Sequence, residues 1–145
     1  MNEGAETPLY VVAVAAVIRR EGKLLAMRRA QTKDAGPGLW ETLSGRVEVG
    51  ETPLEAASRE ILEECGLGVR LEPRPVTCYP ATRLGLPMIV IVYAADYLSG
   101  EVMLSLEHDR YDWVSPTAFA ELSTLTPLVE AVHLAFNLAS PKEMR

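Results

Sequence analysis

GRVEVGETPLEAASREILEECGL, residues 45–67, is the stretch of this 145-residue chain that decides its fold. Thr52 can cap a helix, Pro53 fits the first helical position, and Glu55 completes a capping box with Thr52. Gly66 is a natural helix stop. The stretch therefore predicts a helix between Thr52 and Gly66, preceded by a glycine-marked loop.

This helix would have an apolar side and an acidic side. With an advance of about 100° per residue, one stripe holds the apolar residues Leu54, Ala57, Ile61 and Cys65. The carboxylates of Glu60, Glu63 and Glu64 lie about 120° away, so one side can pack while the other is free for chemistry. Like charges at this spacing repel each other and need a partner.

Two explanations fit the acidic side. Charged residues commonly cover a solvated helix face, and Arg59 can pair with Glu63 or Glu55 at a spacing of four residues. However, Glu48 and Glu51 lie just upstream, and too few arginines accompany these carboxylates to neutralise them all if they converge. Oxygen-rich clusters without histidine suit hard divalent cations, and Mg²⁺ prefers a few carboxylates together with water and phosphate oxygens. The pattern therefore favours metal-assisted hydrolysis of a phosphate ester or anhydride.

The rest of the chain contains further strand-like and helical segments. Apolar and β-branched runs predict strands over residues 10–19, 23–29, 69–79, 87–98 and 111–114, with short strands broken at Gly45 over 40–49. Gly and Pro mark residues 30–40 as a loop. Cap-then-proline pairs at Ser115-Pro116 and Thr126-Pro127 predict later helices, the second continuing to about Leu138. This order predicts an α/β fold in which helices cover both sides of a mixed sheet.

Composition limits the classes to which the chain can belong. Its length suits one domain, expected to span residues 1–145, and 48% hydrophobic residues allow a core to form. The longest apolar run, residues 10–18, is too short to cross a membrane, and the polar start MNEGAETP is unlike a signal peptide, so we expect a cytoplasmic protein. The net charge of −6 argues against binding to nucleic-acid polymers but not against small phosphorylated ligands. Cys65 and Cys78 are expected to be reduced thiols.

The residues of the opening stretch carry a resemblance to a known family. The positions concerned are Gly45, Glu51, Arg59-Glu60, Ile61, Glu63-Glu64, Gly66 and Leu67. At this spacing they match every defined position of the Nudix box, and residues 28–41 and 106–119 are similar to its flanks. The chain is therefore identified as a member of the Nudix hydrolase family, with a MutT-like box. The resemblance implies an α/β/α sandwich with a mixed sheet, and a pyrophosphohydrolase acting on a nucleoside diphosphate linked to another group.

The resemblance also implies a metal and its ligands. Nudix hydrolases use Mg²⁺ or Mn²⁺, and the expected ligands here are Glu60, Glu63 and Glu64, with the backbone carbonyl of Gly45 as a fourth candidate. Family members that hydrolyse nucleoside triphosphates usually have Pro-Gly before this glycine, whereas this chain has Leu43-Ser44. The loop that carries the Gly45 carbonyl can therefore differ in shape.

The catalytic roles follow from the same similarity. Arg59 would orient the carboxylates by pairing with Glu51, and Glu60 is the first candidate for the general base. Glu107 is the second candidate, because related enzymes often bring a late acidic residue from a loop toward the metal. The alternative for Glu107 is an exposed loop charge.

Arg28 and Arg29 are candidates for binding phosphate, because they end the strand predicted over residues 23–29. Neighbouring side chains of a regular strand point to opposite faces, so at most one of the two should face the pocket. The alternative is a solvated surface arginine. His108, in a charged loop, and His133, in an amphipathic helix, are not expected to bind metal.

The sequence supports more than one substrate class. A nucleoside triphosphate is expected first, and ADP-ribose or another nucleotide sugar is the alternative, because Ser44-Gly45 is closer to the Ala-Gly of ADP-ribose hydrolases. A nucleotide-binding sensor without turnover would usually lack box carboxylates, and none is missing here. A diphosphate isomerase of the same fold needs a catalytic cysteine in a context that this chain does not show. The expected partner is a small-molecule nucleotide, bound by a monomer or a homodimer.

Overall fold

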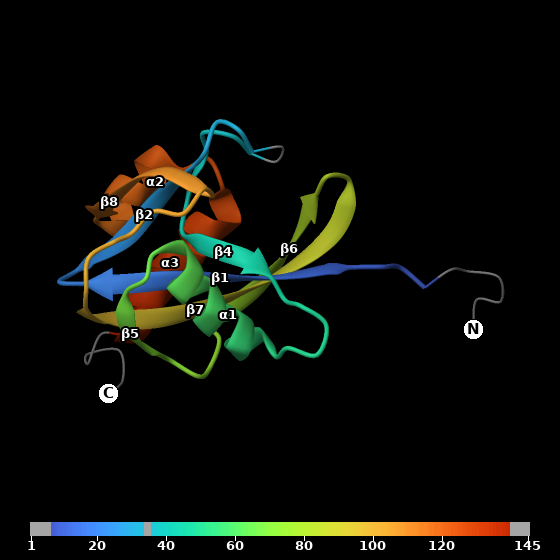
Figure 1. The fold of residues 1–145 in the computed structure, drawn as a ribbon, viewed down its shortest axis with the longest axis horizontal. Coiled ribbons are helices and arrows are strands. Elements are labelled where there is room, and N and C mark those ends of the chain that lie inside the picture. Colours follow the sequence, from blue (N-terminus) through green and yellow to red (C-terminus); the bar gives the residue numbers. More distant parts are fainter. Residues whose placement is uncertain (1–6, 34–35, 140–145) are drawn as a thin grey trace.

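The computed structural model describes residues 7–33 and 36–139, and within them a mixed sheet of eight strands forms the centre of the molecule (Figure 1). The strands are β1 (Val11–Arg20), β2 (Lys23–Arg29), β3 (Trp40–Glu41), β4 (Leu43–Arg46), β5 (Gly68–Leu71), β6 (Thr77–Arg83), β7 (Leu86–Ser99) and β8 (His108–Val114). The helices of the same residues are α1 (Pro53–Glu64), α2 (Pro116–Leu122) and α3 (Thr126–Ala139). Neighbouring strands follow the order β3-β2-β1-β7-β5, with β4 paired to β1, β6 to β7 and β8 to β2.

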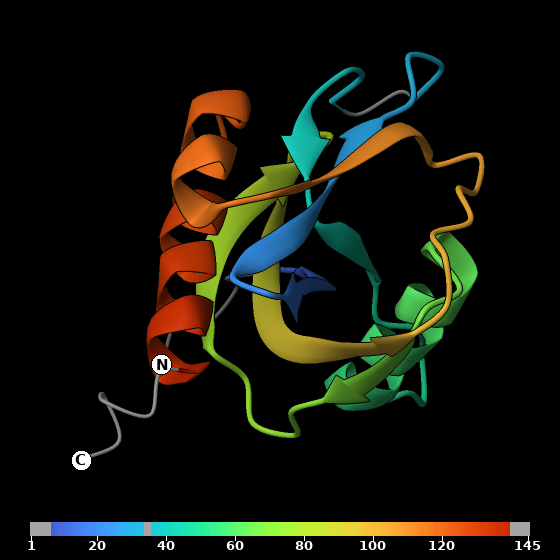
Figure 2. The ribbon, with the colours of Figure 1, turned by 90° about the vertical axis from the view of Figure 1, so that its left-hand side faces the viewer.

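The sheet lies between two layers of helix. In Figure 2, α2 and α3 lie on one side of the sheet and α1 lies on the other. Phe119 and Val132 pack with Val17 in one core, and Ile61 of α1 packs with Ile18 in another. The α/β/α arrangement predicted from the sequence is therefore confirmed. Within the described ranges, no helix has the length and hydropathy to span a membrane.

Strands β1 and β7 form the parallel centre of the sheet. Residues 11–19 of β1 pair with residues 88–96 of β7. Most of β1 is buried, as expected for a strand that is covered by helices on both faces. Strand β4 pairs with β1 in the antiparallel direction, with Gly45 opposite Val14. This pairing fixes the position of Gly45, and with it the start of the connection that leads into α1.

Two of the strand predictions are wrong in where the strands are interrupted. The short strands are separated at Thr42, whereas Gly45 lies inside β4, because its pairing with β1 keeps the backbone extended. The strand predicted over residues 69–79 is two strands, β5 and β6. Pro73 and Pro75 lie between them and cannot donate ladder hydrogen bonds.

Strand β8 is longer than predicted. It begins at His108, three residues before Tyr111, because its pairing with β2 extends back to Arg29 opposite His108. His108 therefore lies in a strand and not in a charged loop, and its side chain is buried. The sheet thus places His108 next to the acidic side of α1.

Helix α1 begins as the sequence predicts. The Thr52 hydroxyl accepts a hydrogen bond from the N–H of Glu55 at 3.2 Å, and the Glu55 carboxylate accepts one from the N–H of Thr52 at 2.9 Å. Gly66 follows the C-cap with a φ of 70°, a left-handed conformation that favours glycine. Both ends of the helix are therefore fixed, and they set the direction of its acidic side.

Thr52→Ala should lower the free energy of unfolding by about 1 kcal/mol, because it removes the hydroxyl that accepts the first-turn hydrogen bond. Urea unfolding measures this change. Ser58→Ala, at an exposed position in the middle of the same helix, is the matched control and should not lower the unfolding midpoint, because alanine favours the helix interior. Equal losses in both variants would contradict the capping role.

Candidate active site

Helix α1 presents its acidic side to an open cavity of about 1190 Å³ that Glu60, Glu63 and Glu64 help to line. The three side chains differ in exposure, with 56% for Glu63, 13% for Glu60 and 6% for Glu64. The prediction of an acidic side that is free of packing is therefore wrong for Glu64. This residue is buried because α1 packs on β4, where Glu64 Oε2 lies 3.4 Å from the backbone N of Ser44.

Arg59 donates hydrogen bonds to three carboxylates of this region, those of Glu51, Glu60 and Glu63. Its Nε and Nη2 atoms donate to the two oxygens of Glu51 at 2.8 and 2.9 Å, which is the pairing implied by the resemblance to the Nudix box. Its Nη1 atom lies 2.6 Å from Glu60 and 3.3 Å from Glu63. The hydrogen bonds from Arg59 lower the pKa of Glu51 to about 2, so Glu51 is ionised at neutral pH. Arg59 therefore holds the carboxylates of the α1 region together.

Gly45 lies against one of these carboxylates. A Cβ atom at this position would overlap the carboxyl group of Glu60. Gly45 is not one of the glycines with positive φ, so the requirement for glycine here is one of space. The close approach brings the backbone of β4 to the acidic side of α1.

Glu64 is a buried carboxyl group with an unusual proton affinity. Burial, together with the nearby charges of Glu60 and Glu41, raises the pKa of Glu64 to about 9 from an ordinary value of 4.5. Between pH 4.5 and about pH 9, the folded protein therefore keeps a proton on Glu64 that the unfolded chain has released. As a result, the stability of the folded state decreases as the pH rises from about 4.5 toward about 9.

A second polar network lies behind Glu64. Glu41 is buried at the end of β3, and its Oε2 atom lies 3.1 Å from Arg29 Nη1 and 2.8 Å from His108 Nε2. The Ser44 hydroxyl donates to Glu41 Oε1 at 3.2 Å. On the other side of its ring, His108 Nδ1 lies 3.9 Å from Glu64 Oε2 and has no hydrogen-bond partner among the described residues. The network therefore extends from Arg29 to Glu64.

Sequence reasoning did not identify Glu41 or His108 as site residues. They are 67 positions apart, and they meet because β2 pairs with both β3 and β8. The only signal in the sequence was that they lie in residues 28–41 and 106–119, the stretches that are similar to the flanks of the box.

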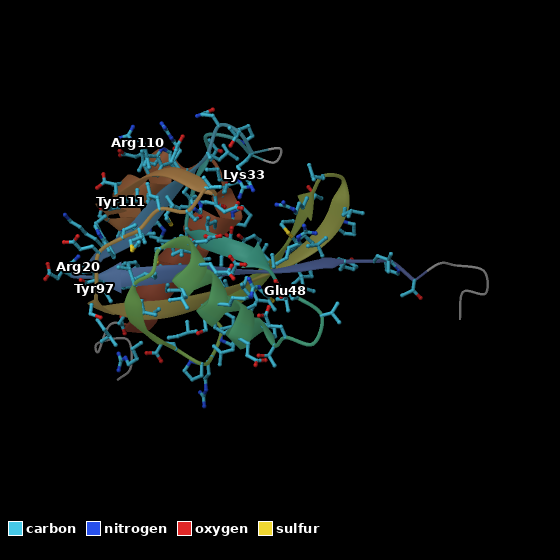
Figure 3. All side chains as sticks on the ribbon, viewed as in Figure 1. Arg20, Lys33, Glu48, Tyr97, Arg110 and Tyr111 are labelled. Carbon is cyan, nitrogen blue, oxygen red and sulfur yellow. The ribbon has the colours of Figure 1, made fainter. Side chains whose placement is uncertain are left out.

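Other predicted site residues divide between the cavity and the surface. Arg29 lines the cavity, whereas Arg28 pairs with an aspartate of β8 at 2.7 Å. Glu107 also lines the cavity, and its carboxylate lies 2.6 Å from Lys33 Nζ. Figure 3 shows Lys33 on the connection after β2 and Glu48 on the connection after β4, and both residues line the cavity. The cavity therefore extends between these two connections.

Part of the cavity wall is apolar, formed by residues that include Tyr79, Met88, Val90, Leu125 and Leu128. Burial, with a smaller effect from the charge of Glu41, raises the pKa of Tyr79 to about 12, so its hydroxyl keeps its proton. Arg46 and Arg83 add positive charge to the same cavity. Apolar surface next to arginines and carboxylates suits an organic phosphate more than a bare inorganic ion.

The carboxylates of α1 do not form a ready-made metal site. Within residues 7–33 and 36–139, no three side chains of His, Cys, Asp or Glu are grouped so that they could hold a metal ion as they stand. Glu60 and Glu63 are instead paired with Arg59. A metal ion would therefore have to compete with Arg59 for these two carboxylates.

Comparisons with known proteins agree on one family. Residues 9–133 match the NUDIX domain. A MutT-like protein from Streptomyces ambofaciens is 35% identical over 122 residues, which cover 83% of this chain and 73% of that protein. The nucleoside triphosphatase NudI from Escherichia coli O1:K1 / APEC is 28% identical over 142 residues, which cover 91% of this chain and 92% of NudI. The crystal structure of a MutT protein from Methanosarcina mazei Go1 is similar with a TM-score of 0.80 and 27% identity, covering 94% of this chain and 99% of that one.

The chain therefore belongs to the Nudix family, a family of pyrophosphohydrolases that act on nucleotides and generally use divalent metal ions. It is also 34% identical over 125 residues to an octanoyltransferase from Myxococcus xanthus, but it spans only 34% of the length of that protein. The similarity to the octanoyltransferase is thus confined to one part of that longer chain.

Proposed function

We propose that this chain is a Mg²⁺- or Mn²⁺-dependent pyrophosphohydrolase that acts on a nucleoside triphosphate, as proteins of the MutT type do. The observation that carries the proposal is the shared cavity, which is lined both by Glu60 and Glu64 of α1 and by charges that can bind phosphate. Arg29 and Lys33 supply those charges from β2 and the connection that follows it. Carboxylates for a metal and cations for phosphate thus line one space.

The acidic side of α1 carries the donor atoms that a hard divalent cation prefers, although Arg59 now pairs with two of its carboxylates. Burial and the charge of Glu60 raise the pKa of Glu64, and a cation between the two carboxylates would remove this penalty. Oxygen donors are those that Mg²⁺ and Mn²⁺ prefer. We assign Glu60, Glu63 and Glu64, with the carbonyl of Gly45, as the residues that would hold the metal. When bound, the metal ion neutralises phosphate charge and lowers the pKa of a coordinated water.

The side chains around the metal ligands supply the rest of the mechanism. Glu60 is assigned as the general base that takes a proton from the attacking water, and Glu107 is the second candidate. Arg59, held by both oxygens of Glu51, orients Glu60 through a contact of 2.6 Å. Arg29 is assigned to phosphate binding. Water attacks one phosphorus in line, so that triphosphate and water give a monophosphate and pyrophosphate without a covalent enzyme intermediate.

Two observations favour a nucleoside triphosphate as the substrate. The apolar wall near Tyr79 and Met88 offers surface for a base, next to the cations that would meet a phosphate chain. The relatives are described as MutT-like and as a nucleoside triphosphatase. The second candidate is ADP-ribose or another nucleotide sugar, which Ser44 next to Gly45 favours.

A substrate panel tests the proposal. The protein is incubated with ribo- and deoxyribonucleoside triphosphates, ADP-ribose and UDP-sugars in the presence of Mg²⁺, and the products are separated by ion-exchange chromatography. The expected result is monophosphate and pyrophosphate in equal amounts, with kcat/KM for the best triphosphate at least about tenfold above that for ADP-ribose. Chelation of the metal should abolish turnover.

Other outcomes of the panel contradict the proposal in different ways. Faster release of AMP and ribose phosphate from ADP-ribose would establish the second candidate. Tight binding of a nucleotide without turnover of any substrate would instead indicate a sensor.

A further inference from the structure

One buried nitrogen atom next to the acidic side of α1 has no hydrogen-bond partner in the part of the chain that the structure describes. His108 is 3% exposed, and its Nδ1 atom makes no hydrogen bond to the described residues. This atom faces Glu64 Oε2 at 3.9 Å, a distance too long for a hydrogen bond. Leaving a buried polar atom unpaired costs free energy, so its placement calls for a reason.

The other side of the ring shows which nitrogen carries a proton. His108 Nε2 lies 2.8 Å from Glu41, whose carboxylate also binds Arg29 at 3.1 Å and Ser44 at 3.2 Å. A carboxylate paired with a guanidinium accepts hydrogen bonds, so Nε2 must donate. In the neutral ring, Nδ1 then has no proton and carries a lone pair that is directed at Glu64.

The His108 ring is held more firmly than the carboxylate that it faces. It is buried in β8 opposite Arg29 of β2, and Glu41 fixes its rotation. Glu64 receives a long contact of 3.4 Å from the backbone N of Ser44 and shares a side-chain hydrogen bond with Glu60, but no guanidinium fixes it as Arg29 fixes Glu41 among the described residues. The side chain that can adjust is therefore Glu64, and it adjusts against a fixed ring.

We propose that His108 is a positioning residue for Glu64. Through Nδ1, which accepts, it sets the orientation of the Glu64 carboxylate by way of one water molecule that donates to both atoms. The contacts run from Arg29 through Glu41 and His108 to Glu64. Residues behind a metal ligand commonly alter metal affinity by about 10- to 100-fold. This inference rests on the proposed function, because Glu64 is assigned there to the metal.

Two substitutions distinguish the role of Nδ1 from that of Nε2. His108→Asn keeps a polar atom near the position of Nδ1, whereas His108→Gln keeps one near Nε2. We expect His108→Gln to raise the dissociation constant for Mn²⁺ by about 10- to 100-fold and His108→Asn to change it by less than about threefold. The probe is Mn²⁺ alone, without nucleotide, measured by the electron paramagnetic resonance signal of the free ion. His133→Gln, on the exposed face of α3, is the matched control and should bind Mn²⁺ like the wild type.

The Mn²⁺ affinities of the two variants, compared with each other, decide whether the inference holds. If His108→Asn weakens Mn²⁺ binding and His108→Gln does not, the ring acts only through Glu41 and the inference is wrong. Unchanged affinity in both variants also overturns it, while the proposed function stands. If the wild type binds no Mn²⁺, both the proposed function and this inference are overturned.

A second measurement does not require a variant to fold. The chain contains two histidines, so ¹⁵N labelling of the imidazoles gives signals from His108 and His133 alone. Addition of Mg²⁺ to the wild type should shift the Nδ1 resonance of His108 more than its Nε2 resonance and leave His133 unchanged. An unshifted Nδ1 at saturating Mg²⁺ would overturn the inference.

Discussion

Glu64→Gln should lower kcat by at least about 100-fold, because a divalent cation contributes several kcal/mol of transition-state stabilisation and about 1.4 kcal/mol corresponds to a factor of ten. Glutamine keeps the shape of the side chain and an oxygen that can accept from Ser44, but it lacks the charge that would bind the metal. The measurement is turnover of the best nucleotide at saturating Mg²⁺. Glu121→Gln, an exposed carboxylate on α2, is the control. Unchanged turnover in both Glu63→Gln and Glu64→Gln would remove these residues from the metal site.

The same substitution should have the opposite effect on folding. At pH 7 the metal-free folded protein retains the Glu64 proton, because the pKa is raised to about 9, whereas the unfolded chain has released it. Glutamine avoids this penalty, so the variant should be more stable than the wild type at pH 8 by roughly 1 to 3 kcal/mol. The difference should shrink toward pH 4.5 and disappear below it, where both states hold the proton. Urea unfolding with a chelator at both pH values measures it, and a variant that is less stable at pH 8 would contradict the burial argument.

Gly45→Ala should reduce kcat by about 100-fold or more, because the added methyl group occupies the place of the Glu60 carboxyl group. Glu60 would have to turn away from Arg59, which now holds it at 2.6 Å. Both assigned roles of Glu60, as metal ligand and as general base, depend on its position. Turnover and Mn²⁺ affinity should therefore fall together in this variant.

Gly50→Ala is the matched control for Gly45→Ala. It lies on the connection between β4 and α1, where a Cβ atom would meet open space, but its φ of 83° strains an alanine. It should therefore lower the free energy of unfolding by about 1 kcal/mol and leave kcat almost unchanged. Equal losses of activity in the two variants would show that backbone strain, and not the displacement of Glu60, is responsible.

The sequence predicted best what depends on neighbours along the chain. The cap at Thr52 and the pairing of Arg59 with Glu63 follow from spacings of three or four residues, and both are found in the structure. The prediction of a sheet between two layers of helix followed from the order of the strand-like and helical segments along the chain. Local patterns were sufficient here because helix periodicity and caps act over one or two turns.

What sequence reasoning missed depends on contacts between distant strands. The burial of Glu64 is set by the packing of α1 on β4, and no spacing within the helix indicates it. Glu41 and His108 come together only through the pairing of β2 with two other strands. The register of β8, which starts at His108, could not be read from a short polar segment, because a shift of one residue turns every side chain to the other face.

The pairing of Arg59 with Glu60 and Glu63 has a consequence for how the protein would respond to changing magnesium levels. Because a guanidinium already balances these carboxylates, an incoming ion gains only the difference between its own attraction and that of the arginine it displaces. Binding then becomes an exchange of one cation for another, and a moderate affinity is expected. A hydrolase of this kind would follow the concentration of free metal over a working range instead of staying saturated at all times.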